Sequence, residues 1–163
     1  MTAAEGGCLC SAVRFAVAAP PQRVTVCHCR FCQRATGGAY MVEPIFEKSD
    51  LTVTQGVAKC YDHRSAGSGK IVHVHFCADC GTKLWLTFER FPEAAGVYAG
   101  TFDQPDWFAI GPETSKHIYL GMARPDTVIP PGLPTFVEHA TMLDGTPQVA
   151  RVFHVPHRIA EDR

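Results

Sequence analysis

The sequence lacks several features that mark common classes of protein. None of its 163 residues lies in an apolar run long enough to span a bilayer, which predicts a soluble protein without membrane contact. Charge of one sign is not in excess, since fifteen basic and sixteen acidic residues leave a net charge of −1, and nucleic acid is not an expected partner. Repeats are absent, and a hydrophobic content of 46% excludes a disordered chain.

An export signal is also missing from the start of the chain. The first residues have no basic segment, include Glu5, and interrupt their apolar stretch with Arg14. The eight cysteines are therefore not expected to form a disulfide framework, because such frameworks belong to short secreted domains. A cytoplasmic location is predicted, where clustered cysteines are more often metal ligands.

The hydrophobic pattern predicts a mainly β fold. Apolar residues alternate with polar or small ones in four stretches, 13–17, 24–26, 72–76 and 84–88. Fourteen glycines and twelve prolines separate these short strands. The early helical candidate is 31–36, which Gly37 and Gly38 end.

From about residue 121 the chain changes character. Prolines interrupt regular strand pairing there, at Pro125, Pro130, Pro131 and Pro134. We expect this extension, residues 122–163, to wrap the sheet as part of a single domain over 1–163. A short final strand is expected near 149–155.

Seven of the eight cysteines fall into three tight groups. These are a C-x-C at Cys8 and Cys10, a C-x-C-x2-C at Cys27, Cys29 and Cys32, and a C-x2-C at Cys77 and Cys80. Residues two apart on a strand point to the same face, so each C-x-C pair is able to face one ion. The C-x2-C with its following Gly81 is typical of a zinc knuckle, because glycine adopts the positive φ that the tight turn needs.

Counting ligands divides these groups between two zinc ions. A closed structural zinc takes four ligands, which the first and third groups supply together. The middle group supplies three from six consecutive residues, which is typical of a catalytic zinc with an open fourth position. In the alternative, both zincs are structural, Cys60 or a histidine completes the second site, and the protein is a non-catalytic module that recruits a protein partner.

The chemistry of the open site favours a thiol substrate. Three thiolates give Zn²⁺ a net negative charge, so the ion lowers the pKa of bound water less than one held by histidines does. It remains a good ligand-binding site for a further thiolate, which stays available as a nucleophile. A small-molecule thiol is therefore favoured over hydrolysis.

Several other residues lie near these motifs. Strand alternation directs His28 away from the metal and toward a supporting role. Arg30 and Arg34 flank the middle group and suit a carboxylate of the ligand. Cys60 is expected to be a semi-buried small apolar residue, and Asp103 is expected to cap a turn.

Four strings of the sequence are similar to one known family. They are GGCLCSAVRF, CHCRFCQRATG, FCADCGTKLW and GTFD, followed by Pro112 and an HIY segment that contains His117. On residues 6–121 the chain resembles the glutathione-dependent formaldehyde-activating enzyme family, which also includes centromere protein V. The resemblance implies a tent-like fold of small antiparallel sheets organised around zinc sites. It also implies a structural zinc on four cysteines, Cys8, Cys10, Cys77 and Cys80, and a catalytic zinc on Cys27, Cys29 and Cys32.

The resemblance further implies a carbon–sulfur lyase type of activity. In that activity glutathione and formaldehyde form S-hydroxymethylglutathione, so a small thiol and a small aldehyde are the expected partners. Two zinc ions per chain are the expected cofactors. One position departs from the pattern, because Ser11 stands where the family usually has glycine after the C-x-C.

Overall fold

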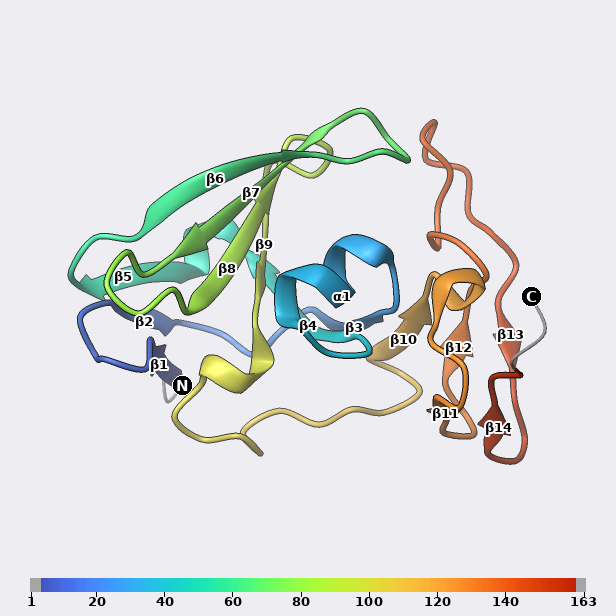
Figure 1. The fold of residues 1–163 in the computed structure, drawn as a ribbon. Helices are drawn as coiled ribbons and strands as arrows, with labels where there is room; N and C mark the ends of the chain where they lie inside the picture. Colours follow the sequence, from blue (N-terminus) through green and yellow to red (C-terminus); the bar gives the residue numbers. More distant parts are fainter. Residues whose placement is uncertain (1–3, 161–163) are drawn as a thin grey trace. The chain divides into compact units, whose positions relative to one another are not determined.

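The protein is described by a computed structural model that covers residues 4–160. Strands dominate the described chain, which confirms the mainly β prediction (Figure 1). Within these residues α1 (Arg30–Thr36) is the one α-helix. No helix among these residues has the length and apolar character to cross a bilayer.

The described residues form two compact units. The first holds residues up to 23 together with Glu43–Ala109, and the second holds Val24–Val42 together with the residues from Ile110 onward. The second unit therefore combines the helical region with the C-terminal extension. A single domain over the whole chain stays a prediction.

The first unit is built from antiparallel strands. One group has the order β1-β2-β5, with β1 (Ala4–Gly7), β2 (Arg14–Val17) and β5 (Leu51–Gln55). The other has the order β4-β9-β8-β7-β6, with β4 (Met41–Glu47), β6 (Lys59–Arg64), β7 (Ile71–Phe76), β8 (Lys83–Phe88) and β9 (Ala94–Val97). Short 3-10 helices, η1 (Lys48–Asp50) and η2 (Ala99–Thr101), follow β4 and β9.

The alternation in the sequence accounts for the core of this unit. In β2 Phe15 and Val17 are fully buried while their neighbours are half-buried, as a strand with one covered face requires. Phe15 packs edge-on against Trp85 of β8, with 6.1 Å between ring centroids, and against Phe102, with 5.4 Å. Burying a side chain of this size contributes about 1.5–3 kcal/mol, so these rings fix the positions of the strands and of the loops between them.

The second unit places β3 (Arg23–Cys27) beside β10 (Ser115–Ile118). The two strands are parallel, and Val26 and Cys27 lie opposite His117 and Ile118. The order continues β3-β10-β12-β13, with β12 (Pro134–Thr135) and β13 (Arg151–Val152). A separate pair is formed by β11 (Val128–Ile129) and β14 (His157–Arg158), and η3 (Leu120–Met122) follows β10.

The C-terminal extension makes more regular structure than its prolines suggest. Pro134 itself lies in β12, and the next residue of this strand, Thr135, donates its hydroxyl to the carbonyl of Arg151 on β13. The predicted final strand near 149–155 is present only as the two-residue β13. The extension also forms a hydrophobic cluster with Leu120, which precedes it; the members from the extension are Ala123, Ile129, Phe153 and Ile159. Apolar contacts of this cluster therefore hold the short strands where long ladders are missing.

The helix predicted over 31–36 is present, and it begins one residue earlier, at Arg30. It ends at Gly37, whose φ of 72° is the left-handed value that glycine adopts without strain, and whose N–H donates to the carbonyl of Gln33. At the other end Cys29 is the N-cap, and its sulfur accepts from the N–H of Cys32 at 3.4 Å. The helix start thus orients two cysteines of the middle group.

Candidate metal centres

The first and third cysteine motifs come together in the first unit. The sulfurs of Cys8, Cys10, Cys77 and Cys80 all lie within 4.8 Å of one another. Cys10 Sγ is 3.6 Å from Cys8 Sγ and 3.7 Å from Cys77 Sγ. A tetrahedral Zn²⁺ with Zn–S bonds of about 2.3 Å places its sulfurs about 3.8 Å apart, so this group fits a closed four-thiolate site. We call it the four-cysteine group.

Two tight turns hold these sulfurs. After Cys77 the chain makes the expected knuckle, in which the N–H of Gly81 donates to the Cys77 carbonyl and Gly81 has a φ of 74°. The hydroxyl of Thr82, which lies 3.1 Å from Cys80 Sγ, and the N–H of Thr82 lower the pKa of Cys80 to about 5. In the other turn the N–H of Val13 donates to Cys8 Sγ at 3.3 Å. Donors placed in this way stabilise thiolates and so favour a bound cation.

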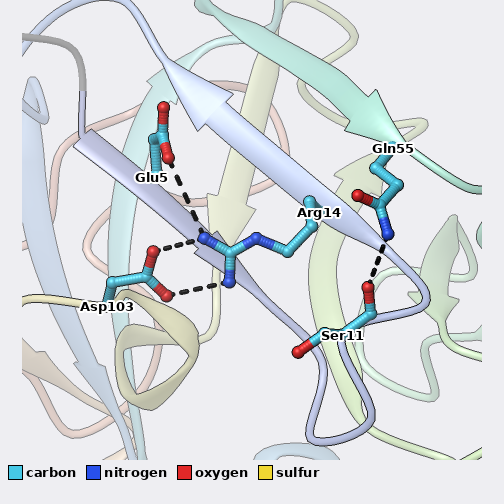
Figure 2. A network of polar contacts seen from close by, with 5 residues as sticks. All are labelled: Glu5, Ser11, Arg14, Gln55 and Asp103. Atoms are coloured by element: carbon cyan, nitrogen blue, oxygen red, sulfur yellow. Dashed lines mark hydrogen bonds and ion pairs between the residues drawn. The ribbon is translucent and has the colours of Figure 1, made fainter.

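An ion-pair network braces the turn that carries Cys8 and Cys10 (Figure 2). The guanidinium of Arg14 on β2 binds both carboxylate oxygens of Asp103, with Nη1 2.9 Å from Oδ1, and Nη2 is 3.9 Å from Glu5. Gln55 donates its amide to the carbonyl of Ser11 at 2.9 Å. The prediction that Asp103 caps a turn is therefore wrong: its carboxylate pairs with an arginine 89 positions away.

The middle motif forms a second group in the second unit, which we call the three-cysteine group. The sulfurs of Cys27, Cys29 and Cys32 lie within 4.8 Å of one another, at the end of β3 and the start of α1. Within residues 4–160 no further Cys, His, Asp or Glu joins this group. The fourth-ligand candidates weighed from the sequence, Cys60 and a histidine, are thus not placed beside these three sulfurs.

The three thiols share their protons. Hydrogen bonds from Cys27 and Cys32 lower the pKa of Cys29 to about 3, although the side chain is largely buried. The same contacts, together with burial, raise the pKa of Cys27 and of Cys32 well above the usual range. A divalent cation bound here would replace the two remaining protons, as is general for thiolate sites. Both cysteine groups are therefore able to bind a metal ion.

A buried histidine pair supports the three-cysteine group. His28 is fully buried, and its Nε2 lies 2.9 Å from Nδ1 of His117 on β10. The two rings stack with centroids 5.3 Å apart. Burial lowers the pKa of His117 to about 4, so its imidazole is uncharged at neutral pH. The side chain of Gln33 fixes the same segment by donating to the carbonyl of His28 at 2.7 Å.

An open recess of about 440 Å³ lies beside this pair. Its lining is Ala39, Tyr40, Arg124, Pro125, Asp126, Thr127 and Val128. The ring of Tyr40, which lines the recess, lies 5.2 Å from that of His28, the residue between Cys27 and Cys29. Arg124 offers an exposed guanidinium there, whereas the carboxylate of Asp126 is engaged by Arg158 at 2.7 Å. No spacing in the sequence indicates Arg124, since it is about ninety positions from the cysteines.

The remaining residues considered from the sequence have other surroundings. Cys60 is exposed on β6, so its interpretation as a semi-buried apolar residue is wrong. Arg30 points its guanidinium at the amide oxygen of Gln33, and Arg34 is exposed on α1. His75 on β7 is half-buried and stacks on Trp85 with centroids 5.1 Å apart.

Comparison with known proteins identifies the family. The model of the family described as "Glutathione-dependent formaldehyde-activating enzyme" matches residues 3–121. A Halomonas elongata protein, provisionally named a glutathione-dependent formaldehyde-activating enzyme, is 27% identical over 136 residues, 72% of this chain and 87% of that protein. A crystal structure of a Rhodobacter sphaeroides protein has 23% identity and a TM-score of 0.49, and covers 67% of this chain and 92% of that chain. The match to the family model covers well over half of the sequence, and the chain belongs to the glutathione-dependent formaldehyde-activating enzyme family.

Proposed function

We propose that this protein is a zinc-dependent enzyme that joins a small thiol, such as glutathione, to a small aldehyde, such as formaldehyde. The reaction centre is the three-cysteine group. One observation carries the proposal: three thiols from a six-residue stretch converge without a fourth ligand from the described part of the chain. Three protein ligands and one exchangeable position are typical of a catalytic zinc, whereas the four-cysteine group has the complement of a structural one.

The bond changes of the proposed reaction are few. The thiol sulfur bonds to the carbonyl carbon, the carbonyl π bond breaks, and the thiol proton ends on the former carbonyl oxygen, giving a hydroxymethyl thioether. Zinc held by Cys27, Cys29 and Cys32 would supply a site where the substrate thiol loses its proton near neutral pH. The product keeps all the atoms of both substrates, so the reaction is an addition whose reverse is the elimination of a carbon–sulfur lyase.

The protein residues around the group position it and leave chemistry to the thiols. His28 and His117 are both buried, and the contact between their rings holds the end of β3 in place. The N-cap contact from the Cys32 N–H to Cys29 fixes the turn between strand and helix. Preorganised sulfurs reduce the entropy lost when substrate binds.

The recess beside Tyr40 is suited to the rest of the thiol molecule. Glutathione carries two carboxylates, and the guanidinium of Arg124 is the exposed cation in the lining. We therefore assign Arg124 to carboxylate binding, in place of the Arg30 and Arg34 that the sequence suggests. Arg124→Gln should raise the KM for glutathione with little change in kcat, while Arg34→Gln should leave both unchanged. The opposite pattern would place the carboxylate on α1.

The proposed reaction is tested directly with zinc-loaded protein. Formation of S-hydroxymethylglutathione from formaldehyde and glutathione is followed by NMR, against the uncatalysed rate. We expect catalysis by the wild type, its loss in Cys32→Ser, and its retention in Cys60→Ser, which removes a cysteine outside both groups. Absence of any rate above the uncatalysed reaction would remove formaldehyde and glutathione as substrates.

Metal removal distinguishes the enzyme from a non-catalytic zinc module. A chelator should remove one of two zinc ions early, with the far-UV circular dichroism unchanged, because an exchangeable position gives the chelator access. Two ions that resist the chelator equally, in a protein without catalysis, would favour the module.

A further inference from the structure

A third set of metal-ligand side chains lies on the hairpin formed by β6 and β7, the adjacent green strands of Figure 1. Cys60 and Asp62 are two residues apart on β6, so their side chains share one face of the sheet. On β7 His73 lies directly opposite Asp62 in the antiparallel register. Directly paired residues point to the same face, and the three side chains therefore meet.

The contacts converge on one carboxylate oxygen. Cys60 Sγ is 3.6 Å from Asp62 Oδ1, and His73 Nδ1 is 2.6 Å from the same atom. The three ligand atoms lie within 4.8 Å of one another. The side chain of Asp62 is 64% exposed and that of His73 is 36% exposed, so an ion from solvent reaches all three.

The neighbouring histidine is engaged elsewhere. His75 pairs with Cys60 across the hairpin, but its ring stacks on Trp85 and its Nε2 lies 3.0 Å from the hydroxyl of Thr87. The cluster is thus a three-residue set with one sulfur, one carboxylate oxygen and one imidazole nitrogen.

This combination of ligand atoms selects the kind of ion. Calcium and magnesium prefer sites made of oxygen atoms, whereas sulfur and imidazole nitrogen favour zinc and the neighbouring divalent transition metals. Bond lengths of about 2.0–2.3 Å place such ligands about 3.3–3.8 Å apart. The Cys60–Asp62 separation already has this value, and a small rotation of His73 away from Asp62 provides the other.

We propose that Cys60, Asp62 and His73 form a third metal site, which binds a zinc-class divalent cation at the protein surface. The thiolate and carboxylate charges balance those of the ion, so the occupied site is neutral. Three exposed ligands bind more weakly and exchange faster than the four-cysteine group does. Occupation links β6 to β7 at mid-strand and stabilises this hairpin in proportion to ligand concentration.

The test is a titration of protein that already holds two zinc ions. Co²⁺ is added, and the near-ultraviolet band of a thiolate–cobalt bond is recorded together with the bound equivalents after gel filtration. We expect wild type to take up one equivalent more than Cys60→Ser. His73→Gln should retain the thiolate yet weaken this uptake by more than about ten-fold.

The control variant is His63→Gln, which removes an imidazole from the other face of β6 and should leave uptake unchanged. Cobalt that merely exchanges into the cysteine groups would appear equally in every variant and so cancels in the comparison. Equal Co²⁺ uptake by wild type, Cys60→Ser and His73→Gln would overturn the proposal. Asp62 and His73 would then be a surface ion pair without a role in metal binding.

Discussion

The two cysteine groups begin with the same C-x-C pattern and differ in what the fold adds to it. The four-cysteine group joins turns 67 positions apart, and Cys8 and Cys77 belong to the hydrophobic core of the first unit. The three-cysteine group is local, since the end of β3 and the start of α1 supply all its sulfurs. A distant C-x2-C completes one group and leaves the other with three ligands. In the proposed function, the first group holds segments together and the second keeps a position for a further ligand.

The largest expected effect comes from breaking the four-cysteine group. Cys77→Ser removes a ligand at a core position, and a structural zinc contributes about 10–16 kcal/mol, comparable with the whole stability of a domain. We expect this variant to be unfolded at room temperature. Circular dichroism and zinc content of the purified protein measure the outcome.

The matched variant is Cys32→Ser in the three-cysteine group. It should stay folded and hold one zinc ion fewer, because α1 and β3 keep their own backbone hydrogen bonds. If both variants unfold alike, the contrast between a structural group and an open group is wrong.

A smaller effect is expected from the support behind the three-cysteine group. His117→Ala leaves Nε2 of the buried His28 without its ring partner, and an unsatisfied buried polar group costs about 1–3 kcal/mol. Urea unfolding should show a loss of stability in this range. The exposed His154→Ala serves as control and should change stability by less than about 0.5 kcal/mol. Equal effects of the two substitutions would show that the histidine pair carries no stabilisation.

The brace of the four-cysteine group should contribute less. Arg14 lowers the pKa of Asp103, but the carboxylate is 47% exposed. Asp103→Asn should therefore lower the free energy of unfolding by no more than about 1 kcal/mol. Because the pKa is lowered in the folded state, this stabilisation is fully present above the unfolded value of about 3.9 and is lost as pH falls through the lowered pKa. Urea unfolding at pH 5–8 should therefore show a constant difference between variant and wild type. A difference that disappeared already between pH 7 and 5 would point to another group.

The smallest expected change is a gain in stability at the turn that carries Cys10. Ser11 has a φ of 61°, in the left-handed region where a side chain is strained. Ser11→Gly should therefore stabilise the protein by about 0.5 kcal/mol after the added freedom of the unfolded chain is subtracted. Ala12→Gly, at a neighbour without positive φ, should destabilise by about 0.5–1 kcal/mol. Thermal denaturation of both variants gives the sign, and a loss of stability in Ser11→Gly would contradict the strain argument.

Local spacing predicted much of the fold, and counting ligands predicted the members of both cysteine groups. The alternation in 13–17 and 72–76 follows from burial of one strand face, and Gly37 and Gly81 stand where the backbone needs a positive φ. These features depend on neighbours within a few residues, so the sequence contains all the information they need.

Contacts between distant residues were missed or misjudged for the opposite reason. Asp103 pairs with Arg14, and Cys60 stands beside His73, because of strand register and loop packing. A shift of one residue in register would turn each side chain to the other face of its sheet. The extension was likewise underestimated, because its two-residue strands are held by a cluster of apolar side chains and not by long ladders.

The sequence by itself determined which cysteines lie together locally, that the chain is mainly β, and where its one described α-helix ends. Only the tertiary structure decided that His28 meets His117 and that Arg124 lies in the recess beside Tyr40. Spacing along a strand or turn is set by covalent geometry, which is short-ranged. Which distant residues become partners depends on which apolar faces of strands and helices pack together and remove their surface from water, and that is a property of the folded chain.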